Sequence, residues 1–423
     1  LKTLLLRMLL IMTKEIKIKK SPNIKNLDTI MFLIVSIDIL FLPYIRFLSV
    51  SISMIILPVW LVFNLKKIRI ERETRLILVF FLFSLLSFLI SIIKYPEWLI
   101  KNNLITLGII LFGFVYYLFF KYYFENYQVK LSKYLYSYII FVFTLAFIYI
   151  IDASTYFKIR SFWTLSGNVI ELESSLLIHR FTSTFSDPNN AATAILGIFV
   201  FLMFNNKLGI ISRIVLATLT FVIIISTMSS TGIIMLLILF ILIAISFLLS
   251  LLRSRGRIQR SGLYSLSISM MLLPFIILVF LIFMDSEVAK VSFERFSMNS
   301  PDSRISIWER LLSKENIFNY LLIGMGGTIL IDEIPFRPHN GHLHLIYNYG
   351  FVSYIIFLYV FFRPRMELAF RRYLFLLPFI IGFTMNVGIY EPRFTNILAM
   401  LVAYYAAETF RKSNNFCLWQ NKS

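Results

Sequence analysis

Cysteine, histidine and charged residues are scarce in this chain. Of its 423 residues, one is cysteine (Cys417), four are histidine and 15% are charged. A single cysteine excludes an internal disulfide framework and any metal site built from several thiolates. Hydrophobic residues make up 59% of the chain and the mean hydropathy is +0.81, whereas soluble domains are nearer half apolar. The composition therefore argues against an ordinary soluble domain.

Long apolar runs recur from one end of the chain to the other. They extend over about 16–23 residues, the length of helix that crosses a bilayer at 1.5 Å per residue. A β-barrel would instead alternate apolar and polar residues over about ten positions. We therefore predict an all-α polytopic membrane protein.

Each apolar run is treated as one predicted span, which makes about twelve transmembrane helices. They lie at residues 29–45, 47–65, 75–93, 102–120, 133–151, 189–206, 210–227, 230–252, 264–284, 343–362, 373–389 and 395–410. Two connecting loops, 152–188 and 285–342, are too long to be simple connectors, and long loops are commonly functional.

The distribution of basic residues predicts the orientation. With both termini in the cytoplasm, the cytoplasmic segments hold 28 of the 41 Lys and Arg residues. This asymmetry is the positive-inside pattern. The net charge of +19 thus reflects topology, and we expect no nucleic-acid partner. We expect cytoplasmic tails at 1–28 and 411–423 around one transmembrane domain, 29–410, with both long loops outside.

The strongest concentration of chemically active side chains lies where the second long loop meets a predicted span. His339, Asn340 and His342 follow Arg337 there, and His344 comes next. Histidine exchanges protons near neutral pH, so His339 is the candidate general base, with Asn340 holding it. A lone loop histidine would suggest no role, but clustering favours a site. A zinc site is the competing interpretation; we predict no metal, because residues two apart on a helix do not share a face.

Arginines in the two long loops are the candidate anion-binding residues. Arg304 falls in the first turn of a predicted surface helix that starts near Pro301, where free N–H groups favour an anion. Arg180 lies where the first long loop returns to the membrane, and Arg160 is a weaker candidate in the same loop. Each has a plain alternative, an exposed or interfacial arginine with no specific role. Asp38 is the clearest charge inside a predicted span and a functional candidate by default.

Four short patterns resemble those of the O-antigen ligase and O-antigen polymerase family of bacterial inner-membrane glycosyltransferases. They lie within residues 180–355 and occur in the order found in the family. They are Arg180…Phe185…Pro188-Asn189, Arg304 with Trp308, Ile323-Gly324-Met325-Gly326, and His339-Asn340 followed by nine residues and Gly350. The chain departs from the family pattern at Met228–Gly232, where a Ser-Arg pair often stands and no arginine is present. Arg180 is our candidate replacement.

The resemblance implies a fold, a substrate and a reaction. The expected fold is similar to that of GT-C enzymes, in the bacterial inner membrane with the active site facing the periplasm. The donor would be an undecaprenyl-diphosphate-linked oligosaccharide, without a cofactor. Arg304 and Arg180 would stabilise the leaving diphosphate, with Arg337, Arg160 and His342 as weaker candidates. Membrane lipids, a chain-length regulator and a flippase are the implied partners.

Three functions remain open from the residues and the resemblance. The leading hypothesis is a polymerase that joins O-antigen or capsular repeat units. The first alternative is the ligase that transfers finished polymer to lipid A core, which has the same donor but a different acceptor. The second is a polysaccharide flippase or other transporter. A transporter would place charged residues in the middle of several spans, and here only Asp38 qualifies clearly.

Overall fold

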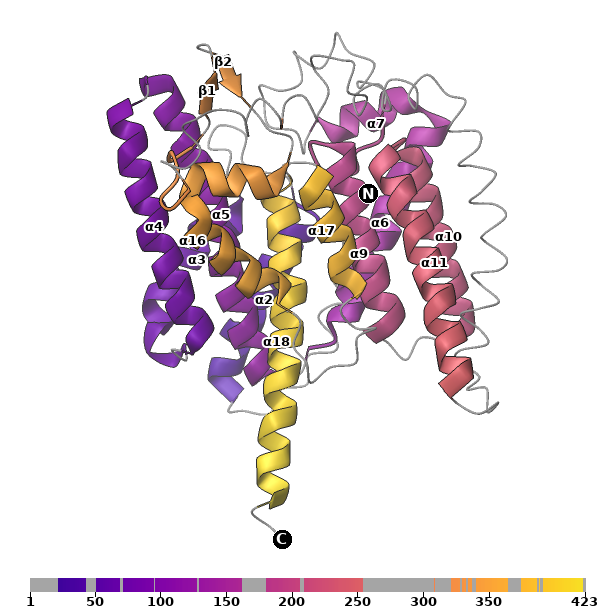
Figure 1. Ribbon diagram of the computed structural model, residues 1–423. Helices are drawn as coiled ribbons and strands as arrows, with labels where there is room; N and C mark the ends of the chain where they lie inside the picture. The colour runs from indigo at the N-terminus through magenta and orange to yellow at the C-terminus, as the bar shows by residue number, and fades with distance from the viewer. Residues whose placement is uncertain are drawn as a thin grey trace.

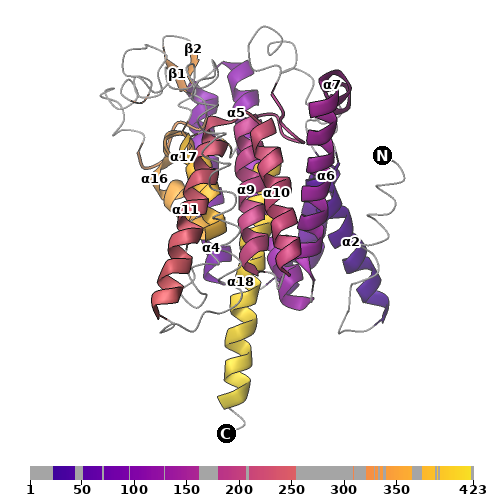
Figure 2. The ribbon, with the colours of Figure 1, turned by 90° about the vertical axis from the view of Figure 1, so that its right-hand side faces the viewer.

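A computed structural model provides the three-dimensional structure of the chain. It describes residues 22–42, 51–68, 71–94, 96–127, 129–161, 180–205, 209–253, 308, 321–327, 329–331, 334–336, 340–363, 374–385, 388 and 391–420. These residues form a helical bundle with one small β-hairpin, as Figures 1 and 2 show.

The first part of the described chain contains ten helices. They are α2 (Pro22–Leu40), α3 (Ile52–Asn64), the short 3₁₀ helix η1 (Leu65–Lys67), α4 (Arg72–Lys94), α5 (Glu97–Asn126), α6 (Leu131–Ile151), α7 (Ala153–Arg160), α9 (Pro188–Asn205), α10 (Ile210–Ser226) and α11 (Ser230–Arg253). The later part contains one hairpin and three helices. They are β1 (Ile329–Ile331), β2 (Ile334–Phe336), α16 (Gly341–Phe362), α17 (Leu376–Met385) and α18 (Pro392–Gln420).

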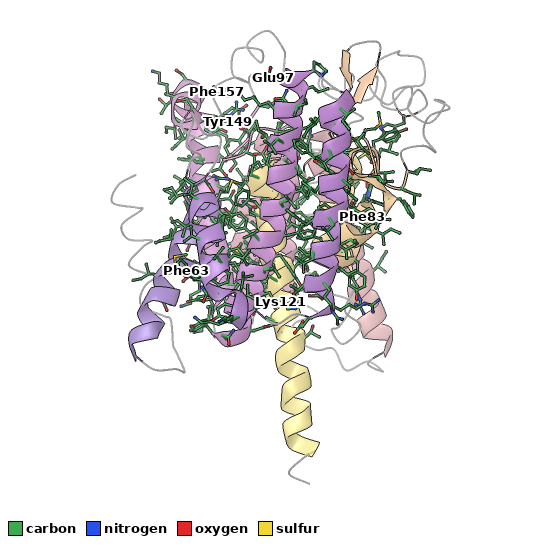
Figure 3. All side chains as sticks on the ribbon, turned by 90° about the vertical axis from the view of Figure 1, so that its left-hand side faces the viewer. Phe63, Phe83, Glu97, Lys121, Tyr149 and Phe157 are labelled. Atoms are coloured by element: carbon green, nitrogen blue, oxygen red, sulfur yellow. The ribbon has the colours of Figure 1, made fainter. Side chains whose placement is uncertain are left out.

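The bundle has two distinct ends, which we name from Figure 1. The upper end carries α7 and the antiparallel β1–β2 hairpin, in which Ile329 is opposite Phe336. The lower end carries the C-terminus, where α18 extends beyond the other helices. Figure 3 labels Glu97 near the upper end and Lys121 near the lower end of α5.

Several helices have the length and composition needed to cross a membrane. Within the described residues, four helices qualify: Arg72–Ile93, Leu99–Asn126, Leu131–Ile151 and Gly341–Phe362. The surface of α4 is apolar, since Leu78 and Leu82 are each 58% exposed. Leaving such residues in water would be costly, whereas lipid solvates them. The helical membrane architecture predicted from the composition is therefore supported.

The predicted spans agree with the helices in position more closely than in length. Eleven of the twelve overlap a described helix, and 264–284 lies outside the described residues. However, α3 has 13 residues and α17 has 10. A helix needs about 20 residues to cross 30 Å of hydrocarbon, so neither crosses by itself. The count of twelve spans and the GT-C likeness remain predictions.

The core is built around α5 and α18, which pack along each other through the bundle. Aromatic rings fill the space beside them: Phe32 of α2 stacks on Tyr123 of α5 with ring centroids 4.4 Å apart. Tyr404 of α18 meets Phe124 edge-on at 5.3 Å. Such pairs add to the stabilisation gained by burying the rings. Packing in this core therefore accounts for part of the abundance of Phe and Tyr in the sequence.

Close approach of α5 and α18 depends on Gly113. A Cβ atom at this position would lie 2.5 Å from Cγ2 of Thr395, a buried residue of α18. Gly108, about one and a half turns earlier on α5, would meet nothing within 4 Å. The two glycines therefore differ in packing, although both are inside the same helix.

We expect Gly113→Ala and Gly108→Ala to change stability in opposite directions. Overpacking at position 113 should destabilise the protein by about 1–3 kcal/mol. At position 108 alanine should stabilise it by about 0.5–1 kcal/mol, because glycine is a poor helix former. Thermal unfolding of both variants in detergent, followed by circular dichroism, measures this difference. Equal effects at both positions would contradict the packing described for α5 and α18.

Candidate functional site

Three segments that are distant in the sequence meet in the upper half of the bundle. They are residues 180–190 leading into α9, the start of α16, and residue 391 at the start of α18. The short helix α17 joins them, because it packs against both α9 and α16. Figures 1 and 2 show α17 between these two helices. We call this region the upper site.

Arg180 is buried at the upper site, where it caps the end of α10. Its Nε donates to the carbonyl of Thr227 at 3.1 Å and its Nη2 to that of Met228 at 2.7 Å. Met228 has a φ of +46°, the left-handed conformation that commonly ends a helix. The last carbonyls of a helix carry partial negative charge and attract a cation. Arg180 thus lies beside residues 228–232, where the family pattern places its Ser-Arg pair.

The segment that follows Arg180 is locked to α9 and α11 by polar side chains. The Asp187 carboxylate accepts from the backbone N–H groups of Asn189 at 2.7 Å and Asn190 at 3.2 Å, so it caps α9. The hydroxyl of Ser229 donates to Oδ1 of Asn189 at 2.7 Å and accepts from N–H of Gly232 at 3.0 Å. The Pro-Asn pattern noted in the sequence is therefore a helix start with a defined position.

Glu391 is a buried carboxyl in the centre of the upper site. It accepts from the backbone N–H of Ser186, at 3.3 Å to each oxygen, and from the Ser186 hydroxyl. Burial raises the pKa of Glu391, an effect that Asp187 reinforces and that Ser186 and Arg393 oppose. Removal from water disfavours the charged form of a carboxyl group. Glu391 is thus suited to hold or exchange a proton.

Arg160, at the end of α7, is the half-buried cation of the upper site. Its Nη2 donates to the carbonyl of Ser186 at 3.4 Å. Its Nε has no hydrogen-bond partner among the described residues. Burial lowers its pKa, while Tyr156, Glu391 and Asp187 raise it. Arginine remains charged even so, so Arg160 places a positive charge beside Ser186.

Arg393, like Arg180, binds the carbonyl groups at the end of a helix. It is 1% exposed and donates to the carbonyls of Leu40, at 3.3 Å, and Leu42. These carbonyls end α2, so α18 is bound to α2 through a guanidinium group. The same helix α2 carries Asp38, whose Oδ2 accepts from N–H of Ser53 at 2.8 Å and from its hydroxyl. Asp38 thus joins α2 to the start of α3.

The start of α16 is fixed by Asn340. Its Oδ1 accepts from the backbone N–H groups of His342 at 2.9 Å and Leu343 at 3.1 Å, the usual geometry of an N-cap. The two ring nitrogens of His342 contact Thr384 of α17 at 3.0 Å and Tyr354 at 3.1 Å. His342 is therefore engaged in joining α16 to α17. Asn340, which we expected to hold His339, uses its side-chain carbonyl oxygen to cap the helix.

Helix α16 bends at Gly350, and a glycine-rich turn fills the break. Gly350 has φ 82° and ψ 168° inside the predicted span 343–362. Such a break leaves backbone groups without helical partners. The turn 321–327 supplies them: N–H of Met325 and Gly326 donate to the carbonyls of Tyr347 and Asn348, each at 2.7 Å.

The other side of the break is completed in the same way. The backbone N–H of Phe351 donates to the carbonyl of Leu321 at 2.5 Å. Two of the four patterns that carry the family resemblance, the glycine turn and the segment ending at Gly350, are therefore in direct contact. Their partner on α4 is Ser87, whose hydroxyl donates to the carbonyl of Ile323.

Part of the predicted site lies outside the described residues. His339, Arg304 and Arg337 are in that part of the chain, so their roles remain predictions. Within the described part, no group of three or more His, Cys, Asp or Glu could hold a metal ion. The expectation of a metal-free site therefore remains open.

Sequence reasoning missed Glu391 and Arg393. The signal was present as Glu391-Pro392-Arg393, immediately before the predicted span 395–410. Proline at the first position of a helix, flanked by an acid and a base, indicates a helix start with charges at the membrane boundary.

The chain was compared with known proteins at three levels. No family model, no characterised protein and no solved structure matches it. The assignment of a function therefore depends on the residues and on the geometry of the upper site.

Replacing Gly326 should detach the glycine turn from α16. Gly326 has φ 79°, and a Cβ atom would clash with the backbone carbonyl of Ser87. We expect Gly326→Ala to destabilise the protein by at least about 2 kcal/mol. Gly209→Ala is the control, because Gly209 has φ −62° and nothing within 4 Å of a Cβ atom. Thermal unfolding in detergent measures the stability of both variants. Equal losses of stability would contradict the anchoring of the turn at Gly326.

Glu391 should make stability depend on pH. Because its pKa is raised in the folded state, the stability it contributes is fully present below its ordinary pKa of 4.5. That stability is lost as the pH rises through the raised value. Glu391→Gln cannot titrate, so the melting temperature of this variant should rise relative to that of the wild type as the pH increases above 4.5. Glu97→Gln, an exposed change, should show no such gain; a parallel gain there would contradict the assignment to Glu391.

Proposed function

We propose that the chain is a metal-independent polymerase of O-antigen or capsular repeat units. It transfers a glycan from a polyprenyl diphosphate to a sugar hydroxyl of another lipid-linked unit, at the outer face of a bacterial inner membrane. The observation that carries the proposal is that Arg160 and the buried Glu391 both bind Ser186, just before α9: Nη2 of Arg160 donates to its carbonyl at 3.4 Å, and Glu391 accepts from its N–H at 3.3 Å. This pair offers a cation for a leaving diphosphate beside a carboxyl group that can hold a proton.

The leaving diphosphate develops negative charge as the glycosidic bond to it breaks. Preorganised guanidinium groups stabilise such charge and match phosphate oxygens with their paired donors. The guanidinium of Arg180 is engaged with the carbonyls of Thr227 and Met228. Arg160 therefore becomes the main phosphate-binding candidate within the described residues, with Arg180 holding α10 in place beside it. Arg304 retains its proposed role in the outer loop.

The acceptor hydroxyl must lose its proton as it attacks the anomeric carbon. His339 remains the proposed base, since imidazole titrates near neutral pH. It directly precedes Asn340, whose cap fixes the first turn of α16. The bend at Gly350 and the glycine turn hold this helix start at the upper site. Apolar helices around the site are suitable for the long isoprenoid tail of the donor.

Purified protein supplied only with lipid-linked repeat units and a chelator tests the proposal. Growth of glycan chains, measured by gel electrophoresis, is the expected result. Transfer to lipid A core without chain growth would replace the polymerase with the ligase. Transport across vesicles without a new glycosidic bond would overturn both.

Arg160→Gln should reduce chain growth by about 10- to 100-fold, which corresponds to loss of a charge-assisted hydrogen bond to phosphate. Lys158→Gln, an exposed change on the same helix α7, is the matched control and should retain the activity. His339→Ala should abolish polymer while expression stays normal. Equal activity of the Arg160 and Lys158 variants would remove Arg160 from the mechanism.

A further inference from the structure

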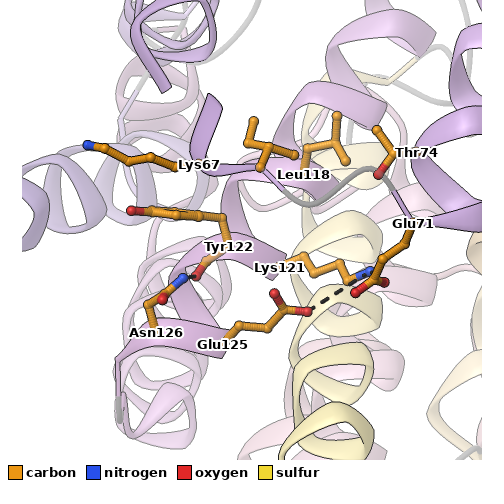
Figure 4. Close-up of a pocket in the computed structure, with 9 residues that line it drawn as sticks. Lys67, Glu71, Thr74, Leu118, Lys121, Tyr122, Glu125 and Asn126 are labelled. Carbon is orange, nitrogen blue, oxygen red and sulfur yellow. Dashed lines mark hydrogen bonds and ion pairs between the residues drawn. The ribbon is translucent and has the colours of Figure 1, made fainter. Parts of the chain in front are cut away.

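The lower end of the bundle contains a cavity with an unusual arrangement of charge. The cavity has a volume of about 250 Å³, and Lys121 of α5 lies in its wall (Figure 4). The Lys121 ammonium group forms ion pairs with Glu71 at 2.5 Å, Glu73 at 3.0 Å and Glu125 at 4.0 Å. The carboxylates at the start of α4 are therefore directed toward α5.

Arg72 stands between Glu71 and Glu73 in the sequence but contacts a different helix. Its Cζ lies 5.4 Å from the ring centroid of Tyr359 on α16. Arg363, which follows the last residue of α16, places its Cζ 4.6 Å from the same ring and donates to the Tyr359 hydroxyl. Two guanidinium groups from helices far apart in the sequence thus share one tyrosine.

Neither arginine has an acidic partner within the described part of the chain. The two acids adjacent to Arg72, Glu71 and Glu73, are paired with Lys121. Both arginines are exposed, and Tyr359 of α16 is partly buried. Two like charges on one ring repel each other, so an anion bound between them would be favourable.

The position of the pair indicates where that anion lies. Arg72 is the first residue of one candidate membrane span, and Arg363 directly follows the last residue of another, Gly341–Phe362. Span boundaries coincide with the lipid headgroups. This end is also the one where the sequence predicts an excess of basic residues.

We propose that Arg72, Tyr359 and Arg363 form a binding site for the phosphate of an anionic phospholipid. Guanidinium groups bind phosphate oxygens through paired hydrogen bonds, and the tyrosine ring holds both groups in place. Two positive charges select an anionic headgroup over a zwitterionic one, whose ammonium group they would repel. The site lies at the opposite end of the bundle from the upper site and does not depend on the proposed function.

The test compares lipid binding by the full chain in detergent micelles. Dioleoylphosphatidylglycerol is titrated against dioleoylphosphatidylcholine, and the apparent Kd is obtained from the shift in melting temperature. Arg72→Gln combined with Arg363→Gln should weaken phosphatidylglycerol binding by about 30-fold. The control combines Lys66→Gln with Arg75→Gln, which removes two exposed charges from the same end; its Kd should change by less than about threefold.

Three results would overturn the proposal. Equal losses in the site and control variants would mean that only the overall charge of this end attracts the lipid. Inorganic phosphate that stabilises the wild type as strongly as phosphatidylglycerol would mean a site for a free anion. If the double glutamine variant does not elute as folded protein in size-exclusion chromatography, Arg363→Lys decides instead. It keeps the charge but lacks the paired donors, and unchanged binding of phosphatidylglycerol would overturn the proposal.

Discussion

The structure depends on one constraint, that backbone polar groups at helix ends and breaks need partners where water is absent. Three ends inside the bundle are satisfied from elsewhere in the chain. Arg180 binds the carbonyls that end α10, Arg393 those that end α2, and the glycine turn 321–327 pairs with the break in α16. Each solution connects elements that are distant in the sequence. The same contacts therefore satisfy the backbone and hold the helices in register.

This constraint also determines the chemistry of the upper site. Guanidinium groups that cap helices are engaged with carbonyl oxygens, so the number of arginines in a region overstates the charge offered to a ligand. Arg180 and Arg393 are of this kind, each donating to two carbonyls at a helix end, whereas Arg160 donates to the carbonyl of Ser186, which precedes a helix. Glu391 lies among these cations but is buried, and burial raises its pKa. At the lower end the charges are separated differently. Glu71 and Glu73 form ion pairs with Lys121, whereas Arg72 and Arg363 lie against the ring of Tyr359.

Parts of the candidate site could be predicted because their signals are local. Pro188-Asn189 before an apolar segment is such a signal of a helix start, whereas Asn340, which we expected to hold His339, proves to be the N-cap of α16. The use of Arg180 could not be predicted, since its partners are 47 and 48 residues away. Glu391 and Ser186 are 205 residues apart, and no periodicity in either segment indicates their contact.

The sequence by itself determined that this is a helical membrane protein and where most helices lie, because apolar runs of bilayer length leave the backbone few alternatives. It also placed the starts of α9 and α16 close to Pro188 and Gly341, with predicted spans that begin at 189 and 343. Only the tertiary structure decided that α16 bends at Gly350, because the break leaves backbone groups that pair with the distant turn 321–327. It likewise decided that Arg180 and Arg393 cap helices, since their carbonyl partners lie in segments that only folding brings together.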